Sequence, residues 1–291
     1  MAGVEHPRHL VPTTWSWALY LYILHDVVLD VQPCEKSLKW LRYCVGVSLG
    51  VEGHLSTRRD KLQVVDYDLP LPADASVILY FWTSSKEKSR MLPVDCHLAN
   101  PRKKTPGSPT LNSRDNSFRP DVEDRDQRCL ATFIPDLKTC EAAHLIPHSK
   151  GDSYILNLTT LRRQAADSDV VSSIDDVRNG VLLHSAIHKV FGTSLAFLEL
   201  PNFAMMTSDV LRGEDATEAV CVAHCFKPSP DNPLLPRVLG PPVRLSGRDR
   251  PHRVLFECVY GFVVMHQFPA RTRSRSFVLA VFPHLFCTLI H

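Results

Sequence analysis

The chain has no apolar run long enough to cross a membrane. Its two most apolar stretches, residues 15–29 and 277–290, fall short of the roughly 20 residues that a spanning helix needs, and the first contains His25 and Asp26. The chain also lacks the basic start, apolar block and small-residue cleavage site of a secretory signal. We therefore expect an intracellular protein, in the nucleus or the cytoplasm, with no membrane partner.

Cysteine pairs and a strong net charge are missing as well. The nine cysteines are scattered and include no CxxC pair, so neither a small disulfide scaffold nor a four-cysteine zinc site is expected. The segment CVAHCF at 221–226 alternates apolar residues and indicates a buried strand. The formal net charge is only +2, so any surface for nucleic acid has to be a local basic patch.

What is present is the composition of a globular protein. The 291 residues are 44% hydrophobic and 22% charged, which predicts a substantial core. We expect an N-terminal region of unknown role at 1–117 with a polar linker from about residue 84, a central domain at 118–210 and a C-terminal extension at 211–291. From about residue 270 the tail turns basic and then apolar, and we hypothesise that it is aberrant, from read-through or a mispredicted exon.

Three segments away from the two histidine motifs predict particular elements. Val77–Trp82 is rich in β-branched and aromatic residues, which favours a strand. Residues 118–129 place acidic side chains early and arginines late, the charge order that a short helix prefers. The apolar run at 254–268 has an ambiguous period, and one interpretation is that it packs back as a final helix.

The first candidate functional residue of the central domain is His144. This histidine follows an apolar, strand-like run and precedes Pro147. Because proline disfavours continuing a strand, His144 is expected near a strand end, where its side chain can face a substrate. A histidine packed at a strand terminus for structural reasons is the alternative interpretation.

A second histidine segment follows the pair Asn179 and Gly180, which is typical of a turn. Apolar residues from 181 to 191 recur at spacings of three and four, which favours a short amphipathic helix. On that helix His184 and His188 share one face and can meet a metal ion. Packing of both histidines without a metal is again the alternative.

These two segments carry a resemblance to a known family. EAAHLIPHSKG (141–151) and DDVRNGVLLHSAIHKVFGTSLAFLELPNFAM (175–205) resemble the HNH nuclease domain, in the variant common in fungal proteins, over roughly residues 128–206. The resemblance implies an α+β fold with a small ββα-metal core and additional α/β segments on both sides. It also implies one divalent metal ion (Mg²⁺, Mn²⁺, Ni²⁺ or Zn²⁺) and hydrolysis of a nucleic-acid phosphodiester that leaves a 5′ phosphate and a 3′ hydroxyl.

The resemblance assigns roles to three residues, His144, Asn179 and His188. His144 is expected to be the general base, because a neutral imidazole with a pKa near about 6.5 can take a proton from water at physiological pH. Asn179 would orient that imidazole or give an oxygen to the metal, and His188 would bind the metal. The side chains available for the phosphate backbone of DNA, with RNA not excluded, are Arg178, Lys189, Arg162 and Arg163.

One departure from the family pattern leaves two functions open. Many related domains have a second metal ligand directly before the base histidine, and this chain has Ala143 there. His148, His184 or Asp152 are the candidates for a replacement. The favoured function is a metal-dependent HNH endonuclease acting on DNA. The alternative is a catalytically inactive protein that keeps the HNH scaffold to bind nucleic acid or another partner, or a purely structural domain.

Overall fold

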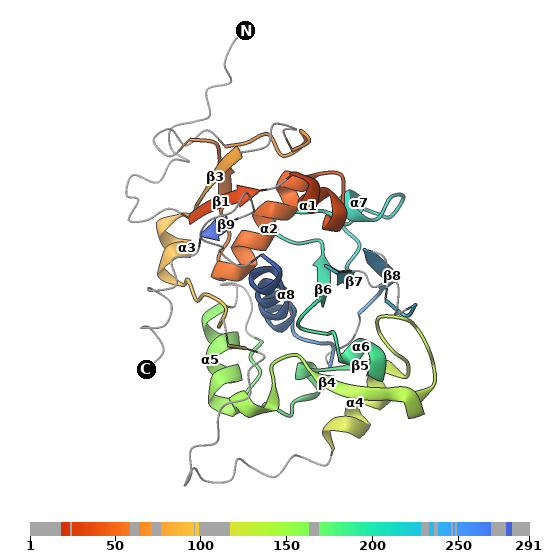
Figure 1. Cartoon of the computed structure of the whole chain (residues 1–291). Coiled ribbons are helices and arrows are strands. Elements are labelled where there is room, and N and C mark those ends of the chain that lie inside the picture. Colours follow the sequence, from red (N-terminus) through yellow and green to blue (C-terminus); the bar gives the residue numbers. More distant parts are fainter. Residues whose placement is uncertain are drawn as a thin grey trace.

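The computed structural model describes residues 19–23, 25–58, 64–71, 77–95, 97–98, 117–162, 169–227, 233–235, 238–245, 247, 249–268 and 278–280. The chain mixes helices with three small sheets, so the predicted α+β class is confirmed (Figure 1). None of the helices in these described ranges has the length and apolar character needed to span a membrane.

Each sheet is built from antiparallel pairs. The first has the strand order β2 (His54–Ser56), β3 (Val77–Trp82), β1 (Leu19–Ile23) and β9 (Val278–Ala280). The second pairs β4 (Cys140–His144) with β5 (Gly180–His184), and the third joins β6 (Leu195–Leu200), β7 (Val220–Cys225) and β8 (Leu239–Val243). The strands predicted at 77–82 and 221–226 are therefore confirmed as β3 and β7.

The helices connect and cover these sheets. The α-helices are α1 (His25–Val31), α2 (Ser37–Leu49), α3 (Ser85–Ser89), α4 (Phe118–Asp126), α5 (Asp152–Arg162), α6 (Ser185–His188), α7 (Thr207–Val210) and α8 (Arg253–Gln267). Three short 3-10 turns accompany them, η2 (Leu137–Thr139), η3 (His148–Lys150) and η4 (Val177–Asn179). The helices predicted at 118–129 and 254–268 are confirmed as α4 and α8.

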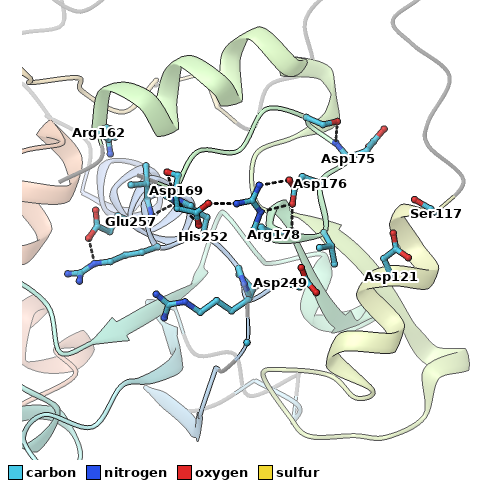
Figure 2. A pocket seen from close by; sticks show the side chains of 17 residues that line it. Ser117, Asp121, Arg162, Asp169, Asp175, Asp176, Arg178, Asp249, His252 and Glu257 are labelled. Atoms are coloured by element: carbon cyan, nitrogen blue, oxygen red, sulfur yellow. Dashed lines mark hydrogen bonds and ion pairs between the residues drawn. The ribbon is translucent and has the colours of Figure 1, made fainter. Parts of the chain in front are cut away.

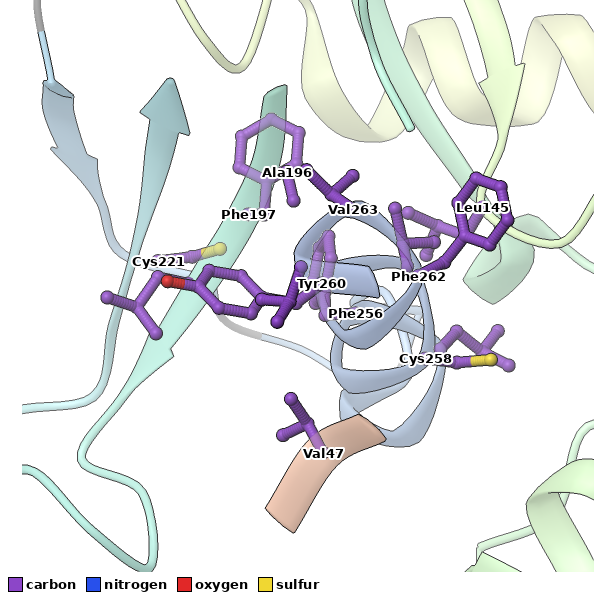
Figure 3. Close-up of a cluster of buried hydrophobic side chains, with 14 of the residues drawn as sticks. Val47, Leu145, Ala196, Phe197, Cys221, Phe256, Cys258, Tyr260, Phe262 and Val263 are labelled. Carbon is purple, nitrogen blue, oxygen red and sulfur yellow. The ribbon is translucent and has the colours of Figure 1, made fainter. Parts of the chain in front are cut away.

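Helix α8 lies at the centre of the core, between α2 and β6 (Figures 1 and 3). Its Phe256 ring packs against Phe197 of β6, with the ring centroids 5.5 Å apart. On the side facing α2, a Cβ atom at Gly261 would lie only 2.9 Å from the carbonyl oxygen of Val47, so the close approach of the two helices requires glycine. One hydrophobic cluster, with members from Val28 to Val264, contains residues from all three predicted regions, 1–117, 118–210 and 211–291. The division itself stays a prediction.

A buried polar network fixes α8 to its neighbours. Tyr260 accepts a hydrogen bond from Trp40 Nε1 at 2.7 Å and donates to His224 Nδ1 at 2.7 Å. His224 Nε2 donates in turn to the carbonyl oxygen of Val31 at 2.7 Å. Because every member has a partner, hydrogen bonds within this network account for the complete burial of His224 near the end of β7.

The ββα unit is formed by β4, β5 and α6, with α4 packed across the two strands (Figure 1). The helix predicted to follow Asn179 is wrong over 180–184, where the chain forms β5, and α6 is only four residues long. The physical reason is that Gly180–Leu183 are all buried, and a strand buried on both faces is apolar at every position and can imitate helical spacing. Gly180 lets α4 approach, because a Cβ atom there would lie 2.4 Å from Val122 Cγ2.

Candidate functional site

His144, the last residue of β4, lines a cavity of about 620 Å³ next to the ββα unit. The strand delivers the side chain to this position because the chain leaves the sheet at Leu145 and turns at Pro147. Further side chains reach this cavity from five segments of the chain: Phe118 from α4, Glu141 from β4, His148 from η3, Asp175 from the turn before η4, and His188 from α6.

The imidazole of His144 is held between a ring and a carboxylate. Its plane stacks on Phe118 of α4, with the centroids 3.9 Å apart and an angle of 9° between the planes. Its Nε2 atom lies 2.9 Å from Oδ1 of Asp175, and both side chains are largely buried, with 14% and 10% of their surface exposed. The other carboxylate oxygen of Asp175 lies 3.5 Å from Nε2 of His148. The predicted base therefore has a defined orientation.

Asn179 connects the two loops that border this histidine. It is completely buried, and its Oδ1 accepts the N–H of Ile146 at 2.8 Å. Its Nδ2 donates to the carbonyl oxygens of Ile146 at 3.0 Å and Ile174 at 2.7 Å. Asn179 therefore fixes the backbone at Ile146, two residues after His144, and at Ile174, directly before Asp175.

His188 lies at the same cavity, on α6, and contacts a carboxylate that the sequence did not single out. Its Nδ1 is 2.5 Å from Oε2 of Glu141, and both side chains are about half-exposed. Because a carboxylate only accepts, the Nδ1–H of His188 is the donor, which leaves the lone pair on Nε2. Glu141 lies 47 positions before His188 in the sequence, and no local pattern in the sequence signals this contact.

The imidazole of His188 has the form of a ligand for a divalent metal ion, but the protein does not supply a complete set of ligands around it. An imidazole whose other nitrogen donates to a carboxylate is the usual form of a metal-binding histidine. Among the residues that the structure describes, however, no three His, Cys, Asp or Glu side chains come together in a way that could hold a metal ion. His188 is thus the candidate ligand, Glu141 is the group that orients it, and water or substrate would have to complete the coordination.

Two of the residues proposed to replace the ligand missing at Ala143 are used elsewhere. Nδ1 of His184 accepts the N–H of Ala186 at 3.2 Å and caps α6. Oδ1 of Asp152 accepts the N–H of Ile174 at 2.7 Å. His148 alone of the three lines the cavity.

The basic side chains expected at the phosphate backbone lie in different settings. Lys189 is exposed, whereas Arg162 is buried and donates to the carbonyl oxygens of Leu92 at 2.8 Å and Val47 at 3.0 Å. We therefore assign Arg162 a structural role and leave it out of the proposed contacts. Arg163 lies outside the described residues.

Arg178 lines a second cavity of about 880 Å³ and is bonded to carboxylates there (Figure 2). Its Nη2 lies 2.7 Å from Oδ2 of Asp176, and its Nη1 pairs with Asp169. Hydrogen bonding to Asp176 raises the pKa of Arg178 above its ordinary value. This cavity is lined by six carboxylates and four arginines, so it does not offer the excess of positive charge that a polyanion needs.

The comparison with known families agrees with this geometry. Residues 129–198 match the model of a family described as HNH endonuclease, and the match spans β4, β5 and α6 together with His144, Asn179 and His188. No curated protein and no solved structure matches the chain. The matched domain indicates a nuclease-type function on nucleic acid, of a kind that generally uses a divalent metal. The resemblance expected from the sequence is confirmed: the chain contains an HNH endonuclease domain at residues 129–198.

Proposed function

We propose that this protein is an endonuclease that hydrolyses DNA phosphodiester bonds in a metal-dependent reaction, with His144 as the general base and His188 as the metal ligand. The observation that carries the proposal is the shared cavity: both histidines line it, and each is bonded to a carboxylate, His144 to Asp175 and His188 to Glu141. With these orientations, the imidazole of His144 is suited to accept a proton and the imidazole of His188 is suited to bind a metal ion.

The proposed reaction uses the residues as follows. A water molecule in the cavity gives a proton to His144, and its oxygen forms a bond to phosphorus as the bond from phosphorus to the 3′ oxygen breaks. The products are a 5′ phosphate and a 3′ hydroxyl. An ion bound at His188 would supply positive charge that stabilises the phosphate and the leaving oxygen. Asn179 keeps the loops at Ile146 and Ile174 in place around His144.

Few basic side chains are suited to hold the nucleic-acid backbone at this cavity. Arg119 lines it and is exposed, with a bond of 2.7 Å to Glu123 on the same helix. Lys189 follows His188 directly and is exposed. We propose these two for phosphate contacts, with Arg178 as a more distant candidate because Asp169 and Asp176 already neutralise it.

The second candidate is a nucleic-acid-binding or interaction protein that keeps the HNH scaffold without turnover. It is favoured by one observation, the buried Ala143 at the position of the expected second ligand. A scaffold without a full set of ligands can still position a nucleic acid through Lys189 and Arg119.

The two functions are separated by incubating the purified protein with supercoiled plasmid, single-stranded DNA and RNA. Each substrate is combined with Mg²⁺, Mn²⁺, Ni²⁺ or Zn²⁺, with EDTA in the control. Metal-dependent nicking of the plasmid is expected for the endonuclease. If only RNA is cleaved, the substrate is RNA and not DNA. A retarded band on a gel with no cleavage under any metal would favour the binding protein.

A further inference from the structure

The carboxylate of Asp175 bonds the imidazole of His144 from a separate segment of the chain. Oδ1 of Asp175 lies 2.9 Å from Nε2 of His144, and the two residues are 31 positions apart in the sequence. Asp175 is 10% exposed, so water screens this pair much less than it would screen a surface pair.

The turn that carries Asp175 is fixed from several sides. The backbone N–H of Asp175 donates to Oγ of Ser173 at 3.3 Å, a bond visible in Figure 2. Ile174, directly before it, is held through its N–H by Asp152 at 2.7 Å and through its carbonyl oxygen by Asn179 at 2.7 Å. A turn with this many bonds holds the carboxylate in one place, as a positioning group requires.

We propose that Asp175 is a positioning residue for the base, which holds His144 in the tautomer that accepts a proton and stabilises the imidazolium that forms. This inference rests on the proposed function. Because a carboxylate only accepts, the bond requires the hydrogen of the imidazole to be on Nε2, and the basic nitrogen is then Nδ1.

The proton balance of the step is complete. Nδ1 of His144 takes the proton of the attacking water, and the imidazole becomes a cation next to the Asp175 carboxylate. The oxygen of that water bonds to phosphorus, the bond to the 3′ oxygen breaks, and the leaving oxygen takes a proton from solvent. The imidazolium later returns its proton to solvent, and Asp175 stays ionised throughout.

The groups around His144 agree with a positioning role. Phe118 faces it from α4 at a centroid distance of 3.9 Å, and His148 faces it from η3 at 5.7 Å. The remaining charged side chains of the cavity are Arg119, Glu141 and His188.

The test is Asp175→Asn, which keeps the size of the side chain and removes its charge. We expect kcat for plasmid nicking to fall by about 10- to 100-fold, the usual cost of removing the partner of a functional imidazole, with KM nearly unchanged. Since a carboxylate favours the protonated imidazole, its loss should also move the acid limb of the pH–rate profile to lower pH.

Asp152→Asn is the matched control, because Asp152 supports the same turn without contacting His144. It should lower the free energy of unfolding but keep the charge of Asp175, so the acid limb of its pH–rate profile should move less than the acid limb of Asp175→Asn. An Asp175→Asn enzyme with unchanged kcat and unchanged profile would overturn the inference. So would a loss of Mn²⁺ affinity in Asp175→Asn, measured by calorimetry, because it would make Asp175 a metal ligand.

A second measurement does not depend on turnover and therefore separates this inference from the proposed function. In ¹⁵N spectra of the wild-type protein, the ring of His144, assigned by its loss in His144→Gln, should carry its hydrogen on Nε2 at neutral pH. In Asp175→Asn that preference should weaken. A hydrogen on Nδ1 in the wild type would contradict the positioning role even if the protein cleaves DNA, and a protein that cleaves nothing but shows the Nε2 tautomer would contradict only the proposed function.

Discussion

The ring of Phe118 stacks on the imidazole of His144, with the centroids 3.9 Å apart and the planes inclined by 9°. Phe118 is the first residue of α4 and precedes the segment that matches the HNH family, which begins at residue 129. The orientation of the proposed base therefore depends on a helix outside the matched segment. A fragment starting at residue 129 would lack this support.

Phe118→Leu should impair the site more than it impairs the fold. Leucine keeps most of the apolar volume but removes the flat surface on which the imidazole stacks, a contact worth about 0.5–1.5 kcal/mol beyond its buried area. We expect a lower nicking rate with a modest fall in the free energy of unfolding, measured in urea. Phe203→Leu, which removes a half-buried ring packed on Tyr43 away from the cavity, is the control. Equal loss of activity in both variants would contradict the claim.

Asn179→Ala should destabilise the protein, because three backbone groups of Ile146 and Ile174 would lose their partners in a buried place. We expect the free energy of unfolding to fall by about 2–4 kcal/mol. Asn202→Ala is a closely matched control, since Asn202 makes the same number of side-chain bonds, to Glu199, Ala204 and Met205, outside the cavity. Nicking should be lost in Asn179→Ala alone when both proteins are assayed well below their unfolding temperatures.

Metal binding should depend on His188 and, to a lesser degree, on Glu141. Calorimetric titration with Mn²⁺ or Ni²⁺ should show no binding to His188→Ala and about 10- to 100-fold weaker binding to Glu141→Gln, because the carboxylate only orients the ligand. His184→Ala removes the histidine that caps α6 and should bind the ion as the wild type does. Unaltered affinity in His188→Ala would place the metal elsewhere.

The stability of the fold should decrease in mild acid because of His224. Burial lowers the pKa of this imidazole to about 4, whereas an unfolded chain titrates it near its ordinary value of 6.5. Between these values the unfolded state binds the extra proton, so the stabilisation is complete above about pH 6.5 and is lost as the pH falls toward about 4.

Between pH 7.5 and pH 5, protonation of His224 in the unfolded state should lower the free energy of unfolding by about 2 kcal/mol. His54 shifts in the same direction, since burial also lowers its pKa to about 4, so the wild type combines both effects. His224→Gln should therefore be less stable than the wild type at pH 7.5, but its free energy of unfolding should decrease less between pH 7.5 and pH 5. Urea unfolding at both pH values measures this, and equal pH dependence in the two proteins would refute the assignment.

The sequence predicted those parts of the fold whose signals are local. The β-branched run of β3 and the charge order of α4 each specify an element without reference to the rest of the chain, whereas the apolar run of α8 has an ambiguous period and allowed a helix as one interpretation. At β5 the local signal failed, because complete burial of Gly180–Leu183 produces an apolar run in which helix and strand spacing cannot be distinguished.

The site was predictable only as far as the family motif extends. His144, Asn179 and His188 were identified by the resemblance, and the structure brings them to one ββα unit. Asp175 and Glu141 were not predicted as functional, because their contacts with His144 and His188 connect residues 31 and 47 positions apart. Contacts of that kind depend on strand register and on the course of a loop, which no local pattern encodes.

The central claim is that His144 is the base of a metal-dependent nuclease, and the most direct measurement is the nicking of supercoiled plasmid by wild type and by His144→Ala. Both proteins are first shown to have the same circular dichroism spectrum and the same Mn²⁺ affinity. The account predicts nicking by the wild type that EDTA abolishes, and a rate reduced by about 10²- to 10⁴-fold in His144→Ala. Equal rates for the two proteins, or no metal-dependent nicking by the wild type, would contradict it.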